Sequence, residues 1–378
     1  MMACRNLFLT SKLSKQLLSN RSSIFYRAMS TESDVLFEDV KGKGVITFNR
    51  PKALNALNLS MVEKLLPTLQ KWEKEKSMVV VKGAGGKSFC AGGDVRAVTE
   101  AGLRGERYGY DFFKKEYIIN GIIGTYGIPY IALIDGIVMG GGVGMSVHAP
   151  YRVATERTLF AMPETAIGLF PDVGGSHFLP RLGGKLGLYL ALTGVRLRGA
   201  DVLKAGIATH YVDSSNLENV EKALLDCSNV QDIDKVLKGF SVVDNNEFSL
   251  KSVMEKINTC FNGSTVEQIC SNLEKDGSSW AQETLKLLNH MSPTSLKITL
   301  EQLNMGSKMN LLECLQMEYR MAVNCLNNKD FYEGVRALLI DKDKSPKWNP
   351  ATISEVSDKL VQSHFSKLPE DEELKHKL

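Results

Sequence analysis

The chain has 378 residues, and 43% of them are hydrophobic, which is enough for one large domain or two modest ones. Its formal net charge is +3, but residues 1–30 hold five basic residues and no acidic one, so residues 31–378 carry a net charge of −2. The body of the chain therefore gives no charge argument for binding nucleic acid, and we expect no nucleic-acid partner.

The N-terminal segment, residues 1–30, is basic, rich in serine and free of acidic residues. This composition is typical of a mitochondrial transit peptide, with cleavage expected near residues 27–33 and a mature protein in the mitochondrial matrix. A disordered N-terminal tail is the alternative. No later stretch approaches the length of about 20 apolar residues that spans a bilayer, so we expect no membrane partner. The seven cysteines are scattered without a CxxC pair, which indicates reduced thiols.

Beyond this segment, short apolar strands alternate with helical stretches. Strands are predicted at residues 44–49, 78–82 and 130–135. After the first strand, Ser60 and Glu63 have capping-box spacing for a helix start, and apolar residues follow at helical spacing. Pro67 should bend this helix or relocate its start. Strands separated by helices favour parallel pairing with crossover helices.

From about residue 215 the pattern changes. Residues 216–290 are polar and indicate helices and loops, whereas residues 308–340 form a strongly helical stretch. We therefore expect an α/β protein with three parts: the transit peptide at 1–30, a core at 31–215 and a helical C-terminal region at 216–378.

Several motif candidates fail. Residues 82–88 (KGAGGKS) are similar to a phosphate-binding P-loop, but that motif requires glycine where this chain has Val81. The segment is explained as a turn after the preceding strand. His148 and His177 have no GxSxG nucleophile beside them, and no metal-ligand spacing occurs. Both histidines are interpreted as structural, and no metal site is expected.

Two glycine-containing turns are better candidates for a ligand site. Residues 89–94 (FCAGGD) and 139–144 (MGGGVG) each follow an apolar strand and can present bare backbone amides to a cleft. Alone, the first is explained as a turn capped by Asp94 and the second as a close helix crossing. Because an oxyanion hole needs amides from two segments, the pair favours one, with the second amide at a helix N-terminus.

Residues 160–172 (FAMPETAIGLFPD) place two carboxylates, Glu164 and Asp172, in an almost uncharged apolar stretch. Carboxylates are costly to bury unless they are paired, and an apolar setting moves their pKa toward neutral pH. Amides for an oxyanion and a carboxylate for water make a candidate acyl-transfer site. Glu116 lies in a predicted helix, where a lone glutamate is usually a solvated surface residue.

Together these segments resemble the crotonase (enoyl-CoA hydratase/isomerase) superfamily. The resemblance rests on Arg50-Pro51, Asn55-Ala56-Leu57, FCAGGD at 89–94, GGGVG at 140–144, FAMPE at 160–164, DFYEGVRA at 330–337 and Lys347-Trp348. It covers residues 35–225 and implies a crotonase-like ββα spiral core. The longer run from Phe160 to Gly184 resembles the branch that hydrolyses the thioester of 3-hydroxyisobutyryl-CoA in valine breakdown.

The resemblance also implies roles for single residues. The two oxyanion amides of the superfamily fall on Gly93 and Gly141. Hydratases use two glutamates, of which one matches Glu164 and the other falls at Gly144, so enoyl-CoA hydration is disfavoured. The hydrolase branch is associated with Glu116, Gly141, Glu164 and Asp172, and all four identities are present.

We therefore expect an acyl-CoA thioester hydrolase in which Glu164 and Asp172 are catalytic and Glu116, Gly93 and Gly141 bind the substrate. Glu164 either activates water as a base or attacks the thioester to form an anhydride, and the sequence leaves both routes open. The small-molecule substrate itself contains CoA, and no separate cofactor is expected.

Two other functions stay open: a non-catalytic crotonase-fold scaffold of a mitochondrial assembly, and a different acyl-CoA hydrolase or hydratase. A scaffold has no reason to keep three site carboxylates, and substrate profile separates the enzymes. The resemblance further implies that the backbone around Ala53–Leu54 meets CoA. It also implies a homo-oligomer, since superfamily members commonly form trimers or hexamers, although the 216–300 segment could block that packing.

Overall fold

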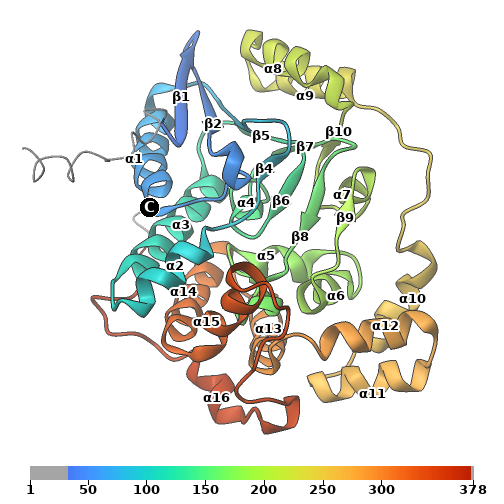
Figure 1. Ribbon diagram of the computed structural model, residues 1–378. Coiled ribbons are helices and arrows are strands. Elements are labelled where there is room, and N and C mark those ends of the chain that lie inside the picture. Colours follow the sequence, from blue (N-terminus) through green and yellow to red (C-terminus); the bar gives the residue numbers. More distant parts are fainter. Residues whose placement is uncertain (1–32, 376–378) are drawn as a thin grey trace, which may run out of the picture. The chain divides into compact units, whose positions relative to one another are not determined.

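The computed structural model describes residues 33–375, so the predicted transit peptide lies outside the described residues. Two β-sheets lie at the centre of this part of the chain, and helices pack around them (Figure 1). The strands are β1 (Val35–Val40), β2 (Lys43–Phe48), β3 (Val79–Gly83), β4 (Ser88–Cys90), β5 (Tyr130–Ile134), β6 (Ile137–Met139), β7 (Tyr151–Ala154), β8 (Leu159–Ala161), β9 (Leu197–Arg198) and β10 (His210–Tyr211). The three predicted strands are confirmed to within one residue at each end.

From β3 to β8, successive strands alternate between the two sheets. The larger sheet has the order β1-β2-β3-β5-β7-β10 and the smaller one β4-β6-β8-β9. Strands β2, β3, β5, β7 and β10 pair in parallel, and so do β4, β6 and β8. Each consecutive pair, β3-β4, β5-β6 and β7-β8, thus gives one strand to each sheet. This arrangement is the ββα spiral that the resemblance implied.

Helices follow the strand pairs and continue beyond them. The helices of the first part are α1 (Leu59–Glu75), α2 (Val95–Leu103), α3 (Tyr108–Thr125), α4 (Gly141–Gly144), α5 (Gly175–Phe178), α6 (Leu186–Thr193) and α7 (Ala200–Lys204). Those of the second part are α8 (Leu217–Asp226), α9 (Val230–Phe240), α10 (Met254–Cys260), α11 (Val266–Asp276), α12 (Ser279–Leu288), α13 (Pro293–Gly306), α14 (Leu311–Asn327), α15 (Lys329–Val335) and α16 (Asp358–Ser363). Within residues 33–375, none of the helices has the length and hydropathy that crossing a bilayer requires.

Helix α1 begins earlier than its predicted capping box. The side chain of Asn58 accepts a hydrogen bond from the Met61 N–H at 2.8 Å and caps the helix. The expected start at Ser60 and Glu63 is therefore wrong. Asn58, two residues before Ser60, is the N-cap and already accepts from an N-terminal amide of the helix. The helix continues through Pro67, and its buried face is Met61, Val62, Leu65, Leu69 and Trp72.

The larger sheet has a core on each face. Along β3, Val79 and Val81 belong to the main core, while Val80 between them faces a second cluster. This alternation follows from the two-residue repeat of a strand. The second cluster is completed by α8 and α9 through Val220, Leu224, Ile233 and Leu237. Both faces of the sheet are thus covered, as parallel strands require.

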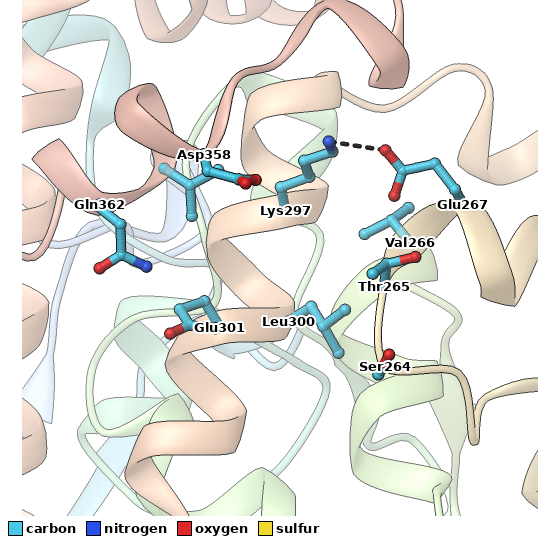
Figure 2. A pocket seen from close by; sticks show the side chains of 10 residues that line it. Ser264, Thr265, Val266, Glu267, Lys297, Leu300, Glu301, Asp358 and Gln362 are labelled. Atoms are coloured by element: carbon cyan, nitrogen blue, oxygen red, sulfur yellow. Dashed lines mark ion pairs between the residues drawn. The ribbon is translucent and has the colours of Figure 1, made fainter.

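A cavity of about 180 Å³ lies between α11, α13 and α16 (Figure 2). Its lining residues are Ser264, Thr265, Val266, Glu267, Lys297, Leu300, Glu301, Asp358, Val361 and Gln362. The Lys297 Nζ lies 2.7 Å from a Glu267 carboxylate oxygen and donates to the Val356 carbonyl at 3.0 Å. This cation is already paired, and the cavity contains no residue of the predicted site.

Candidate active site

Three predicted site segments follow neighbouring strands of the smaller sheet. Gly93 comes after β4, Gly141 after β6 and Glu164 after β8. Because these strands are parallel neighbours in that order, their carboxyl ends meet at one edge. The spiral therefore brings together segments that are far apart in the sequence.

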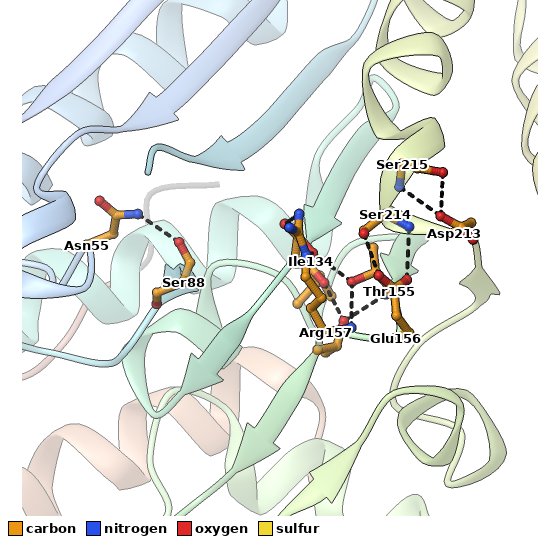
Figure 3. Close-up of polar contacts among 11 residues, drawn as sticks. Asn55, Ser88, Ile134, Thr155, Glu156, Arg157, Asp213, Ser214 and Ser215 are labelled. Atoms are coloured by element: carbon orange, nitrogen blue, oxygen red, sulfur yellow. Dashed lines mark hydrogen bonds and ion pairs between the residues drawn. The ribbon is translucent and has the colours of Figure 1, made fainter. Parts of the chain in front are cut away.

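The segment that carries Gly93 is anchored through Asn55, whose side chain is bonded to Ser88 (Figure 3). Asn55 is fully buried and has φ of +57°. Its side chain has three partners: the Arg50 N–H at 2.9 Å, the Ala84 carbonyl at 2.9 Å and the Ser88 carbonyl at 2.8 Å. The neighbouring Leu57 then pairs with Gly93 in an isolated parallel bridge. The loop before α1 thus fixes the turn after β4.

The two predicted oxyanion amides lie close together. A Cβ atom at Gly141 would lie 3.2 Å from the Gly93 nitrogen and 2.4 Å from the Glu116 Oε1. Neither the Gly93 nor the Gly141 N–H donates to an oxygen of residues 33–375. Gly141 is the first residue of α4, where amides have no intrahelical partner. Its preceding Gly140 has φ of +44°, a backbone conformation that favours glycine.

Glu116 is buried, with 1% of its surface exposed, so it does not follow the usual tendency of a lone helical glutamate to lie at the solvated surface. Helix α3 packs against α1 on one side and α14 on another, which leaves almost no solvated face. The Glu116 Oε1 has no hydrogen-bond partner in the described part of the chain. Burial, reinforced by the negative charges of Asp172 and Glu164, raises the pKa of Glu116 well above its usual value.

Glu164 opens a short 3₁₀ turn, Glu164–Ile167, directly after β8. Its side chain is buried against α4, because a Cβ atom at Gly140 would lie 2.7 Å from the Glu164 Oε1. The Oε2 has no partner among the described residues. Burial and then the charge of Asp172 raise the pKa of Glu164 well above its usual value. The raised pKa makes the Glu164 carboxylate a stronger base than an exposed one.

Asp172 is also buried, but it is hydrogen-bonded. The Tyr117 hydroxyl donates to the Asp172 Oδ2 at 2.7 Å. Burial raises the pKa of Asp172 from 3.8 to about 7, and the bond from Tyr117 opposes that rise. Helix α3 therefore supplies both Glu116 and, one residue later, the donor that holds Asp172.

The loop that carries Asp172, residues 171–176, is held by groups that the sequence analysis did not select as site residues. Val173 has φ of +53°, which is unusual for a β-branched residue, and His148 bonds its carbonyl at 2.7 Å. Burial lowers the pKa of His148 to about 4, so the ring is neutral and donates this bond. The structural interpretation of His148 agrees with this contact.

Helices α13 and α14 complete the hold on this loop. The Glu318 carboxylate accepts from the Gly174 N–H at 2.7 Å and the Ser176 N–H at 2.9 Å. The Gln302 Nε2 donates to the Pro171 carbonyl at 2.7 Å. A sequence signal for Glu318 exists, since it shares the apolar face of α14 with Cys314, Ala322 and Cys325 at helical spacing. Burial raises the pKa of Glu318 to about 8.

Glu116, Glu164, Asp172 and Glu318 are four buried carboxyl groups, and within residues 33–375 none of them forms an ion pair. The free N–H groups of Gly93 and Gly141 lie beside Glu116 and Glu164. This arrangement combines donors for a developing oxyanion with carboxyl groups whose pKa values burial raises, as acyl transfer to water requires.

The ββα spiral with paired amides at its strand ends defines a class of proteins, the enoyl-CoA hydratase/isomerase family. Residues 43–365 match that family, and the chain belongs to it. Among known proteins, the chain is similar to the mitochondrial 3-hydroxyisobutyryl-CoA hydrolases of Xenopus laevis (58% identity over 334 residues, 86% of each chain) and Homo sapiens (54% over 347 residues, 89% of each).

Two solved structures share the fold over nearly the whole chain. A carnitinyl-CoA dehydratase from Mycobacterium thermoresistibile is 37% identical with a TM-score of 0.85, covering 92% of this chain and 99% of that one. An enoyl-CoA hydratase from Rhodobacter sphaeroides is 36% identical with a TM-score of 0.81, covering 91% and 100%. The predicted fold class and family resemblance are confirmed.

Proposed function

We propose that the chain hydrolyses the thioester of 3-hydroxyisobutyryl-CoA and releases 3-hydroxyisobutyrate and free CoA. Relatives at 51–58% identity over most of their length carry the name of that hydrolase. Within the site, one observation carries the assignment: the buried Glu164 lies beside α4, whose first amide, on Gly141, adjoins that of Gly93.

The oxygen of the thioester carbonyl accepts hydrogen bonds from the Gly93 and Gly141 N–H groups. Water adds to the carbonyl carbon, the carbon–sulfur bond breaks, and the CoA sulfur leaves and takes a proton. Negative charge develops on the carbonyl oxygen, where one such amide donor is worth about 3 kcal/mol. Glu164 takes the proton of the attacking water, or its carboxylate attacks first and water opens the resulting anhydride.

Asp172 and Glu116 orient the attacking water and the hydroxyl group of the acyl chain. Their oxygens accept a hydrogen bond from the acyl chain, so they favour a substrate that brings a hydroxyl donor over a plain acyl group. The bond from Tyr117 keeps the Asp172 carboxyl group in one orientation.

The space around Gly144 argues against a hydratase. A Cβ atom there would lie 2.6 Å from the Val173 Cβ and 2.8 Å from the Asn120 Nδ2. A second carboxylate therefore has no room at this position. The three site carboxyl groups also argue against a scaffold, because unpaired buried carboxyl groups lower stability without helping a structural role.

We further propose that residues 1–30 direct the protein to the mitochondrial matrix and that the chain divides into a core at 31–215 and a helical region at 216–378. The names of the relatives include "mitochondrial", which supports the organelle. The helices α8 to α16 support the second boundary.

The proposed function is tested by free-thiol release from 3-hydroxyisobutyryl-, 3-hydroxypropionyl- and crotonyl-CoA. We expect Glu164→Gln to fold normally and to lose about 100-fold or more in kcat, the usual contribution of a positioned base. Glu267→Gln is the matched control, since Glu267 pairs with Lys297 in the cavity between α11, α13 and α16. Near wild-type kcat in Glu164→Gln would refute the role of this residue, and hydration of crotonyl-CoA without thiol release would refute the reaction.

A further inference from the structure

Asn120 is a buried amide beside the site that the proposed mechanism does not use. It lies on α3 one turn after Glu116 and therefore on the same face of the helix. Its exposed fraction is 0%, and neither its Oδ1 nor its Nδ2 has a hydrogen-bond partner among residues 33–375.

Asn55 provides a comparison within the same chain. It is buried to the same degree, and its side chain makes three hydrogen bonds to backbone groups, of which Figure 3 shows the one to Ser88. Buried polar groups are nearly always satisfied in this way, because an unpaired donor or acceptor away from water costs free energy. A carboxamide with both of its polar atoms unpaired, next to reactive groups, therefore indicates a ligand.

The position of Asn120 suits one part of an acyl group. Along α4, a Cβ atom at Gly141 would meet the Glu116 Oε1 at 2.4 Å, and one at Gly144 would meet the Asn120 Nδ2 at 2.8 Å. The two glycines are separated by about 4.5 Å along the helix axis. A hydroxyl group on the third acyl carbon lies about 4 Å from the carbonyl carbon, counting two C–C bonds and one C–O bond. A carbonyl held at Gly141 thus puts this hydroxyl within reach of Asn120.

We propose that Asn120 is a specificity-determining residue that binds the hydroxyl group of the acyl chain. Its Nδ2 donates to the hydroxyl oxygen, and its Oδ1 accepts the hydroxyl proton. A carboxyl group supplies a donor only in its protonated form, whereas a carboxamide supplies both halves of the interaction at every pH. This inference rests on the proposed hydrolase function and adds the group that recognises its substrate. A buried water molecule offers the same donor and acceptor as the substrate hydroxyl, so the experiment must distinguish the water from the hydroxyl as the partner of Asn120.

The test compares thiol release from 3-hydroxyisobutyryl-CoA and isobutyryl-CoA, which differ only in the hydroxyl group. In Asn120→Leu we expect kcat/KM for the hydroxylated substrate to fall about 30-fold and that for isobutyryl-CoA to change less than about threefold. The melting temperature should stay unchanged or rise, because an unpaired amide is replaced by an apolar group of similar size. Asn272→Leu is the control, since Asn272 lies in α11 and its Nδ2 donates to the Cys260 carbonyl.

Asn120→Ala carries the same test if the leucine variant does not fold, because it removes the carboxamide without adding bulk or a titratable group. An equal loss of kcat/KM with both substrates would mean that Asn120 binds a buried water or only packs, and it would overturn the inference. Unchanged kcat/KM values for both substrates would overturn it as well. Failure of the wild-type protein to release thiol from the hydroxylated substrate would instead overturn the proposed function, so the two failures are distinguishable.

Discussion

Replacing Asp172 by asparagine is expected to stabilise the fold above neutral pH while activity is lost. Burial raises the pKa of Asp172 from 3.8 to about 7 in the folded state. Between these values the folded protein holds a proton that the unfolded chain has released. The contribution of this group to stability is therefore fully present below about pH 4 and is lost as the pH rises through 7. The raised pKa values of Glu116 and Glu164 act in the same direction.

The size of the effect follows from the same values. A pKa of about 7 in place of 3.8 corresponds to about 4 kcal/mol of lost stability once both states are ionised. In Asp172→Asn the side-chain oxygen still accepts from Tyr117, as the protonated carboxyl group of the wild type does at low pH, and the bond to the ionised form is already included in the raised pKa. We therefore expect the variant to be about 4 kcal/mol more stable than the wild type well above pH 7, and about equally stable below pH 4.

Urea denaturation followed by far-UV circular dichroism between about pH 4 and about pH 9 measures these free energies. The wild-type free energy of unfolding should fall across this range, and that of Asp172→Asn should fall less. Glu267→Gln is the control: the pKa of Glu267 is lowered, so its contribution is lost only as the pH falls through 4.5 and below, and the variant keeps the wild-type slope above pH 5. A wild-type slope in Asp172→Asn, or lower stability than the wild type above pH 7, would refute the reasoning.

Two further variants test the geometry of the site. Glu318→Gln puts an amide donor against the Gly174 or Ser176 N–H, so we expect the Asp172 loop to shift and kcat to fall about 10- to 100-fold with little change in KM; an unchanged kcat in steady-state assays would argue against a positioning role. Gly141→Ala brings a Cβ atom within 2.4 Å of the Glu116 Oε1, so thiol release should fall about 100-fold in a protein with a native circular dichroism spectrum. Full activity in that variant would remove Gly141 from the oxyanion hole.

The parts of the site that could be predicted from sequence are those encoded locally. Gly93 and Gly141 follow apolar strands as glycine turns, and Glu164 lies in an uncharged stretch, so each carries its own signal. The parallel order of β4, β6 and β8 then suffices to bring them together. Local signals also compete. At α1 the side chain of Asn58 caps the helix, although Ser60 and Glu63 have capping-box spacing two residues later.

The remaining parts depend on contacts between distant segments. Glu116 is typical of a surface residue in its own helix, and it is buried because α14 covers α3. The unpaired amide of Asn120 becomes recognisable only when its neighbours Gly144 and Val173 are placed. Helical spacing could have singled out Glu318, but not the loop amides it would meet.

These contacts change the meaning of the boundary near residue 215. The composition changes there, yet Gln302 and Glu318 from the second part hold the loop that carries Asp172 in the first. Without α13 and α14, the Gly174 and Ser176 amides would lose their acceptor, and only the bond from His148 would hold Val173 at its positive φ. A truncated core could keep its sheets and its oxyanion amides and still lack an oriented Asp172. The helical region is therefore a working part of the site, and a fragment ending near residue 215 should not be expected to hydrolyse a thioester.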